Sequence, residues 1–251
     1  MRPVEAVGVL VPAHDESETI GACVRSVLTA LDAVPGLRVR ALCVLADRCS
    51  DGTAARARDA IARHPAGARV RHAVLETGPG DPPAPVGAVR ARAAATVLTL
   101  LGSPGPPGAE AGRTWLLSTD ADCTVEPGWV RGHLARADSG ADAVIGGVVL
   151  DLPGSPVPPG EPPPPDRPVY AANLGVRATA FTAVGGFPAI DCGEDHGIVA
   201  RLRASGYRVL PGPVDDVRTS ARTVGRARGG LADLLARHAG VGGRVAGSPV
   251  A

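Results

Sequence analysis

The stretch AVGVLVPA, residues 6–13, followed by SETIGACVRSVLTAL, residues 17–31, decides the fold. The first segment is an apolar run without polar alternation, as in a parallel strand that is buried on both faces. In the second segment the apolar residues recur at helical spacing. These residues are Ile20, Cys23, Val24, Val27, Leu28 and Leu31. A buried strand followed by an amphipathic helix predicts the first unit of a parallel α/β sheet.

The same alternation continues along the chain. Strand patterns occupy 38–46, 69–76 and 113–120, and helix patterns occupy 50–64 and 86–102. Further on, 140–154 predicts a strand or hairpin arm, 173–187 a short strand and helix, and 194–206 a helix. We therefore predict a single α/β domain over 1–251, with an open, mostly parallel sheet and helices on both faces. Proline lacks the amide hydrogen, so the Pro-rich stretch 153–168 predicts a loop, and we expect 240–251 to be a disordered tail.

Composition excludes several classes of function. The 251 residues are 45% hydrophobic and 2% aromatic, with a formal net charge of +1, which argues against a nucleic-acid-binding surface. No run reaches the roughly 18 to 20 apolar residues of a membrane span, which leaves only peripheral membrane contact open. The five cysteines lack metal spacing and the first residues lack a signal-peptide pattern. We therefore expect a cytoplasmic protein with reduced thiols.

Two carboxylates follow the strand pattern at 113–120, in the sequence LLSTDADCTV at 116–125. Asp120 and Asp122 can both face one hard cation, such as Mg²⁺ or Mn²⁺, that also binds a diphosphate. We predict these two residues as metal ligands. Aspartate is also common in turns after strands. The letters DADCT further match the DxDxT of haloacid-dehalogenase-type phosphatases, which use a downstream lysine, and this chain has no lysine.

Five segments together resemble the successive blocks of family 2 glycosyltransferases, which have the GT-A fold. In chain order they are VGVLVPAHDESETIGACVRSVL, VLADRCSDGTAARA, LLSTDADCTVEPGWV, NLGVRATAFTAVGGF and GEDHGIVARLRASGYRV, so the resemblance covers about 6–230. It implies a Rossmann-like GT-A domain with a nucleotide-binding half, 1–125, and an acceptor-binding half, 126–240. The QxxRW motif and membrane helices of processive members are missing from the sequence, so the chain resembles the soluble, non-processive members.

The resemblance also implies which residues contact the nucleotide-sugar donor. Those at the base and ribose are Pro12, Ala13, His14, Glu16 and Asp47, and those near the diphosphate are Arg90, Ser118, Asp120, Ala121 and, as a further candidate, Arg222. Other roles stay open for three of them. Glu16 also suits a helix start, Arg90 also suits a solvated helix face, and Arg222 also suits a basic surface loop. We expect Asp51 to structure the turn at SDGT rather than to contact the ligand.

On the acceptor side, the resemblance implies that Asp195 is the catalytic base and that Glu194 positions acceptor or sugar. The residues implied to line the donor sugar and acceptor are Asn173, Arg177, Gly185 and Gly186. As alternatives, the two acids complement the N-terminus of their helix, and the two glycines only permit positive φ.

The expected function is a hexosyltransferase that uses a divalent cation, Mn²⁺ or Mg²⁺, and a UDP- or GDP-linked donor. The acceptor is a hydroxyl of a small molecule, lipid or polymer, and family membership implies inversion, although close relatives with the same blocks retain configuration. Two alternatives remain: a catalytically silent nucleotide-sugar-binding protein, and a nucleotidyltransferase, which would need a Gly-rich phosphate loop that the N-terminus lacks.

Overall fold

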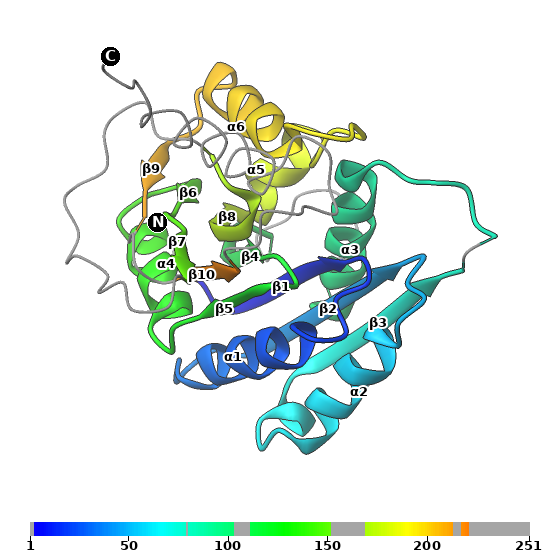
Figure 1. Ribbon diagram of the computed structural model, residues 1–251. Coiled ribbons are helices and arrows are strands. Elements are labelled where there is room, and N and C mark those ends of the chain that lie inside the picture. Colours follow the sequence, from blue (N-terminus) through cyan, green and yellow to red (C-terminus); the bar gives the residue numbers. More distant parts are fainter. Residues whose placement is uncertain (1–2, 79, 103–110, 152–168, 213–216, 221–251) are drawn as a thin grey trace, which may run out of the picture.

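A computed structural model describes residues 3–78, 80–102, 111–151, 169–212 and 217–220 (Figure 1). The Pro-rich stretch 153–168, Arg222 and the tail 240–251 lie outside the described residues, so the predictions for them stay predictions. Within the described ranges, no helix has both the length and the apolar character that crossing a membrane requires.

The first half of the chain alternates strands and helices as predicted. Its elements are β1 (Ala6–Ala13), α1 (Ile20–Asp32), β2 (Val39–Asp47), α2 (Thr53–Arg63), a 3-10 turn (Gly67–Arg69), β3 (Arg71–Thr77), α3 (Val86–Leu100), a second 3-10 turn (Ala111–Arg113) and β4 (Thr114–Ser118). Strand β1 matches its prediction at both ends. Helix α1 begins later than predicted, because the chain makes a turn in which Glu16 O accepts from the backbone N–H groups of Thr19 and Ile20.

The second half departs more from the prediction. Its elements are β5 (Cys123–Val125), α4 (Trp129–Asp138), β6 (Ala143–Ile145), β7 (Val149–Asp151), a 3-10 turn (Ala171–Asn173), β8 (Leu174–Arg177), α5 (Ala178–Ala183), α6 (Glu194–Ala204), β9 (Val209–Pro211) and β10 (Val217–Ser220). The predicted strand and helix of 173–187 and the helix of 194–206 are confirmed. The segment 140–154 holds two strands that belong to different sheets, and β5, α4, β9 and β10 were not predicted.

The main sheet has the strand order β3-β2-β1-β4-β8-β6-β9. Strand β1 pairs in parallel with β2 and β4, β2 pairs in parallel with β3, and β6 pairs in parallel with β9. Only β8 is antiparallel to its neighbours, β4 and β6. A second sheet, of order β5-β10-β7, lies beside it. The prediction of a mostly parallel α/β sheet is confirmed.

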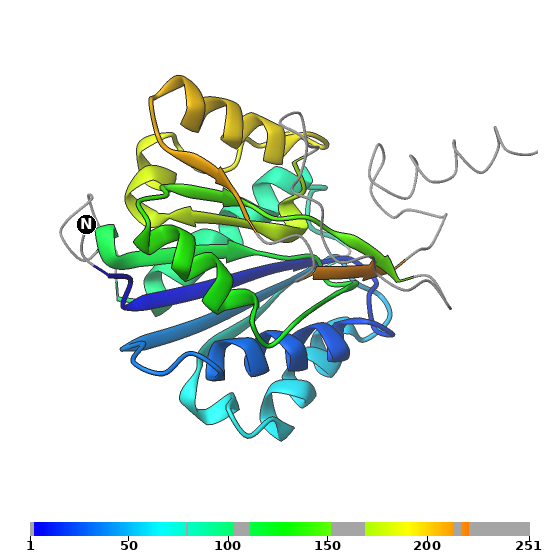
Figure 2. The same ribbon diagram turned by 90° about the vertical axis from the view of Figure 1, so that its left-hand side faces the viewer.

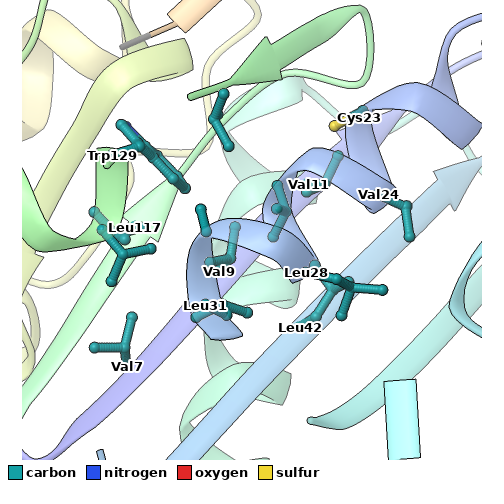
Figure 3. Packing of buried hydrophobic residues seen from close by; sticks show 14 of the residues in the cluster. Val7, Val9, Val11, Cys23, Val24, Leu28, Leu31, Leu42, Leu117 and Trp129 are labelled. Carbon is teal, nitrogen blue, oxygen red and sulfur yellow. The ribbon is translucent and has the colours of Figure 1, made fainter. Parts of the chain in front are cut away.

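Helices cover both faces of the main sheet (Figures 1 and 2). Residues of α1, α2 and α4 build the core on one face, and residues of α3, α5 and α6 build the core on the other. Val7, Val9 and Val11 of β1 pack toward Leu28 and neighbouring residues of α1 (Figure 3). Leu10 belongs to the opposite core. Because β1 is buried on both faces, its sequence is a continuous apolar run.

The parallel strands β1, β2 and β4 end at one edge of the sheet. The loops that follow them are 14–19, 48–52 and 119–122, and in the strand order β1 stands between β2 and β4. Ligands of open α/β sheets bind beyond the carboxyl ends of the strands, where the strand order reverses. This edge therefore holds most of the residues that the sequence analysis singled out.

Candidate functional site

A buried arginine joins the acidic turn after β4 to the start of α6. Arg90, on α3, is 4% exposed. Its Nε donates to Glu194 Oε1 at 2.9 Å, its Nη1 donates to Ser118 Oγ at 2.9 Å, and its Nη2 donates to Asp120 Oδ1 at 2.5 Å. The guanidinium thus joins two segments that are far apart in the sequence, the end of β4 with the turn after it and the start of α6.

The electrostatics of this contact keep Arg90 charged. Burial alone would lower its pKa, but the carboxylates of Asp120 and Glu194 outweigh that effect and raise it. Burial and the nearby charge of Asp195 raise the pKa of Glu194, and the guanidinium offsets only part of that rise. Removing one partner of such a buried pair is costly, because the other charge remains in a poorly solvated place. We predicted that Arg90 binds the diphosphate. That stays a prediction, and the three contacts favour a positioning role.

Three side chains of the acidic turn after β4 lie close enough together to bind one metal ion. One ligand atom from each of Asp120, Asp122 and Cys123 lies within 4.8 Å of the others. The side chain of Asp120 is 36% exposed, whereas Cys123 is 1% exposed. Carboxylate oxygens in this number suit Mg²⁺ or Mn²⁺, which leave further positions for phosphate oxygens. The residues present therefore fit the divalent cation that the sequence analysis expects.

Asp47 is held rigidly at the end of β2. Its Oδ1 accepts from the Thr77 hydroxyl at 2.7 Å, and its Oδ2 accepts from Arg48 Nε at 3.1 Å. Its backbone oxygen is 2.7 Å from His14 Nδ1, and since a carbonyl only accepts, this ring nitrogen carries the hydrogen. His14 follows Pro12 and Ala13, the last residues of β1, which pair with β2. The structure thus brings the predicted base-binding residues together.

The loop between β1 and α1 is tied to the loop after β2. Glu16 is 6% exposed, and its Oε2 accepts from the Thr19 hydroxyl at 2.7 Å, so it lies at the start of α1. Asp51 accepts from the backbone N–H of Ser17 at 2.8 Å and from that of Thr53 at 3.0 Å. The predicted turn role of Asp51 is confirmed.

A second group with possible ligand spacing, Asp15, Cys49 and Asp51, lies in the same two loops. Asp15 has a positive φ of 51°, and its Oδ1 accepts from Ser50 N at 2.7 Å. Its backbone N–H contacts Cys49 Sγ at 3.3 Å. These contacts and those of Asp51 account for the group as loop structure.

Asp195 lies in the first turn of α6 with both carboxylate oxygens engaged. Its Oδ2 accepts from Ala171 N at 3.1 Å, and its Oδ1 accepts from His196 N at 2.7 Å. Its neighbour Glu194 points to Arg90 instead, and its side chain is 8% exposed. The two acids therefore have different environments. Glu194 is buried in the contact with Arg90, whereas Asp195 is only partly buried.

Asn173 has a role in the core. It is 1% exposed, and its Oδ1 accepts from Trp129 Nε1 and from His133 Nε2, both at 2.8 Å. Its Nδ2 donates to Gly147 O at 2.7 Å. With its polar atoms engaged in the interior, Asn173 contributes to the site by shaping the chain around it, and its predicted contact with sugar stays a prediction.

Arg177 is not brought to the acidic turn. It pairs with Trp115 near the start of β4, because β8 runs antiparallel to β4, whereas Asp120 follows the other end of β4. Its guanidinium lies 5.5 Å from the centre of the Trp115 ring and donates to the backbone oxygens of Gly112, Ala137 and Ala141. These contacts favour a structural role for Arg177, near the start of β4, and its predicted contact with sugar or acceptor stays a prediction.

The glycines of VGGF form the turn after α5. Gly185 and Gly186 have φ values of 77° and 65°, a region that residues with a side chain rarely adopt. A Cβ on Gly186 would also lie 2.9 Å from the Phe181 ring. The alternative explanation from the sequence, that these glycines permit positive φ, accounts for both.

Sequence reasoning missed two threonines that position site residues. Thr53 donates to Asp51, and Thr77 donates to Asp47. Thr53 belongs to the SDGT turn, so the sequence carried a capping signal for it. Thr77 meets Asp47 only because β3 pairs with β2 in that register, which no local pattern reveals.

Comparisons with known proteins agree with this fold. A model of the family described as "Glycosyltransferase like family 2" matches residues 3–159, more than half of the chain. A search of curated proteins finds no match. Among solved structures, residues 1–349 of S. aureus TarS align with a TM-score of 0.55 at 15% identity, covering 86% of this chain and 61% of that one.

Two further solved structures contain ligands. Mannosyltransferase PcManGT from Pyrobaculum calidifontis, in complex with GDP-Man and Mn²⁺, gives a TM-score of 0.54 at 16% identity, covering 90% of this chain and 59% of that one. Glucosyl-3-phosphoglycerate synthase from Mycobacterium tuberculosis, in complex with Mn²⁺, UDP and phosphoglyceric acid, gives 0.52 at 16% identity, covering 92% and 74%. At these identities the likeness shows the fold, GT-A. The chain spans about three fifths of the TarS and mannosyltransferase structures.

Proposed function

The chain belongs to glycosyltransferase family 2, and from this premise we propose that it transfers a sugar from a nucleoside-diphosphate sugar to an acceptor hydroxyl. The observation that carries the proposal is the contact of buried Arg90 with both Asp120 and Glu194. The contact joins the turn that carries Asp120 and Asp122, carboxylates suited to a cation, to the start of the helix that carries Asp195, a carboxylate suited to a proton. A reaction that releases a diphosphate and deprotonates a hydroxyl needs both.

On the donor side, Asp120 and Asp122 would hold Mn²⁺ or Mg²⁺. The similar mannosyltransferase and synthase structures contain Mn²⁺ or Mg²⁺ together with GDP-Man or UDP, which supports this assignment. When bound, the cation neutralises charge on the departing diphosphate. Asp47, oriented by Thr77 and Arg48, would accept a hydrogen bond from the nucleotide base.

On the acceptor side, Asp195 would act as the base. Its carboxylate is held by the N–H groups of Ala171 and His196, so it occupies a defined position before the acceptor binds. The acceptor oxygen would attack the anomeric carbon and lose its proton to Asp195 while the bond from that carbon to the diphosphate oxygen breaks. A single displacement of this kind inverts the configuration at the anomeric carbon, which is the stereochemistry that we propose.

Calorimetric titration of UDP, GDP, ADP and TDP, each with Mn²⁺, with Mg²⁺ and with EDTA, tests the donor assignment. We expect one diphosphate to bind in the presence of a cation and to lose affinity in EDTA. Asp122→Asn should weaken that binding about tenfold or more, since it removes a charged ligand. Asp59→Asn, a half-exposed carboxylate on α2 away from the edge, is the matched control and should change nothing. Binding that ignores EDTA would contradict the proposed cation site.

Asp195→Asn tests the base. With the nucleotide identified, transfer of sugar to water or to a trial alcohol can be followed by release of the diphosphate. The rate should fall about 10²- to 10⁴-fold, because a positioned base contributes that much, while nucleotide affinity stays constant. Asp191→Asn, an exposed carboxylate nearby, is the control. Unchanged turnover in Asp195→Asn would reject Asp195 as the base. If the parent protein binds the nucleotide tightly but shows no turnover, the chain is better explained as a catalytically silent binding protein. The configuration of the released sugar, read by NMR, tests inversion.

A further inference from the structure

We propose that the C-terminal strand β10 positions the cation ligand Asp122 through Cys123, which lies between Thr219 of β10 and the Asp122 carboxylate. The inference rests on the proposed function, because Asp122 needs positioning only if it binds the cation. In it, Cys123 and Thr219 are positioning residues that contact neither cation nor substrate.

The sheet pairing brings Thr219 to Cys123. Strand β10 lies between β7 and β5, and it runs antiparallel to β5 with Thr219 opposite Cys123. Residues opposite each other on antiparallel strands have Cβ atoms about 4.5–5.5 Å apart, which is within reach of a hydroxyl and a sulfur. This register therefore places the Thr219 hydroxyl beside the Cys123 sulfur. Both side chains are buried, with exposed fractions of 6% and 1%.

Cys123 in turn contacts the carboxylate of Asp122. The distance from Cys123 Sγ to Asp122 Oδ1 is 3.6 Å, and the thiol is the donor because an ionised carboxylate only accepts. A single weak hydrogen bond of this type adds little stability. Its effect is on orientation, because partners behind a metal ligand fix its direction and commonly change metal affinity 10- to 100-fold when they are removed.

The other buried thiols do not have this contact. Cys23 of α1 donates to the backbone oxygen of Asp120 at 3.3 Å, so it holds the main chain of the turn rather than a carboxylate. Cys43 of β2 is fully buried in the opposite core. Cys43→Ala therefore removes the same atoms as Cys123→Ala, from a comparably buried place that is not part of the acidic turn.

Mn²⁺ affinity of the intact chain, measured by the EPR signal of free Mn²⁺, tests the proposal without any assay of turnover. Cys123→Ala should raise the Mn²⁺ dissociation constant about tenfold. Cys123→Ser keeps a donor at this position and should stay close to the parent protein, and Cys43→Ala should not differ from it. A loss of packing alone would not be rescued by serine. Equal Mn²⁺ affinity in Cys123→Ala and the parent protein would overturn the inference and leave the proposed function standing.

Thr219 provides the second arm. Thr219→Val preserves shape and removes the hydroxyl, so it should weaken Mn²⁺ binding, whereas Thr219→Ser should not. In the Cys123→Ala background, Thr219→Val should not change the Mn²⁺ affinity further, because Thr219 acts on Asp122 through the Cys123 sulfur. If the two substitutions lower the Mn²⁺ affinity additively, each acts by its own packing and the inference is overturned. If Cys123→Ala does not fold, as judged by urea denaturation, the two Thr219 variants decide alone.

Two results separate the remaining explanations. Co²⁺ bound to the parent protein should show no sulfur-to-metal charge-transfer absorption; a band that disappears in Cys123→Ser would make Cys123 a direct ligand and overturn the positioning role. If the parent protein binds no Mn²⁺, whether alone or with UDP or GDP, the proposed function fails and this inference fails with it.

Discussion

At the scale of single residues, Arg90 is the side chain on which the geometry of the site depends. It is 4% exposed, and Glu194, which accepts from its Nε, is 6% exposed. In Arg90→Met the carboxylate of Glu194 would stay buried without its cationic partner. We therefore expect Arg90→Met to lower the free energy of unfolding by about 3–5 kcal/mol, as measured by urea denaturation at pH 7.

Two controls show whether the charge causes this loss. Arg92 lies on the same helix and is exposed, so Arg92→Met should change the free energy of unfolding by about 0.5 kcal/mol or less. Because the pKa of Glu194 is already raised, this residue takes up a proton readily, and at pH 5 the loss in Arg90→Met should be smaller. Similar stabilities of the Arg90 and Arg92 variants would mean that the contact with Glu194 does not stabilise the fold, which would leave Arg90 free for the diphosphate role that the resemblance implies.

The sequence was informative about the carboxylates of the site and less so about their partners. Asp47 ends β2 and Asp120 follows β4, and because both strands run parallel to β1 their ends lie at one edge of the sheet. The contact of Arg90 with Glu194 joins residues 104 positions apart. It requires α3 and α6 to pack on the same face, and a single sequence carries no local signal for that packing.

At the scale of elements, predictability followed length and periodicity. Strands β1 and β2 and helices α1 and α3 have long apolar patterns and were predicted. The more polar β3 and α2 and the short β8 were predicted as well. Strands β5, β9 and β10 have only three or four residues, so their existence depends on pairing partners rather than on their own composition. Helix α4 is different. Its buried residues, Trp129, Val130, His133, Leu134 and Ala137, follow helical spacing, so the signal was present in the sequence and was missed.

The segment 140–154, for which we expected a strand or a hairpin arm, holds the strands β6 and β7, which belong to different sheets. Between β6 and β7 the chain passes close to Asn173, and a Cβ on Gly146 would lie 2.0 Å from Asn173 Nδ2. Gly146 permits this approach, after which the chain leaves the main sheet for the second one. Gly146 therefore lies where the chain crosses from one sheet to the other.

At the scale of the whole molecule, a polar cluster in the interior links α4 to the segment before β8. Asn173 Oδ1 accepts hydrogen bonds from Trp129 Nε1 and His133 Nε2. Since Asn173 Oδ1 is the acceptor, the hydrogen of the neutral His133 ring is on Nε2. Its Nδ1 is buried and has no hydrogen-bond partner among the described residues. Protonating His133 would create a second N–H without an acceptor, so the native fold favours the neutral ring.

This cluster predicts a loss of stability in acid. Burial lowers the pKa of His133 from 6.5 to about 4, with the Asn173 hydrogen bond opposing part of the shift. The unfolded chain therefore takes up this proton below about pH 6.5 and the folded chain only near pH 4, so stability from this group falls as the pH falls between the two values. The full effect is about 3–4 kcal/mol, at about 1.4 kcal/mol per pKa unit. Urea denaturation at pH 7, 5.5 and 4.5 measures it, with His133→Gln as the control, since glutamine can donate to Asn173 and does not titrate. As the pH falls, the unfolding free energy of the parent protein should decrease relative to that of His133→Gln. If the difference between the two proteins stays constant from pH 7 to 4.5, the fold does not hold His133 neutral.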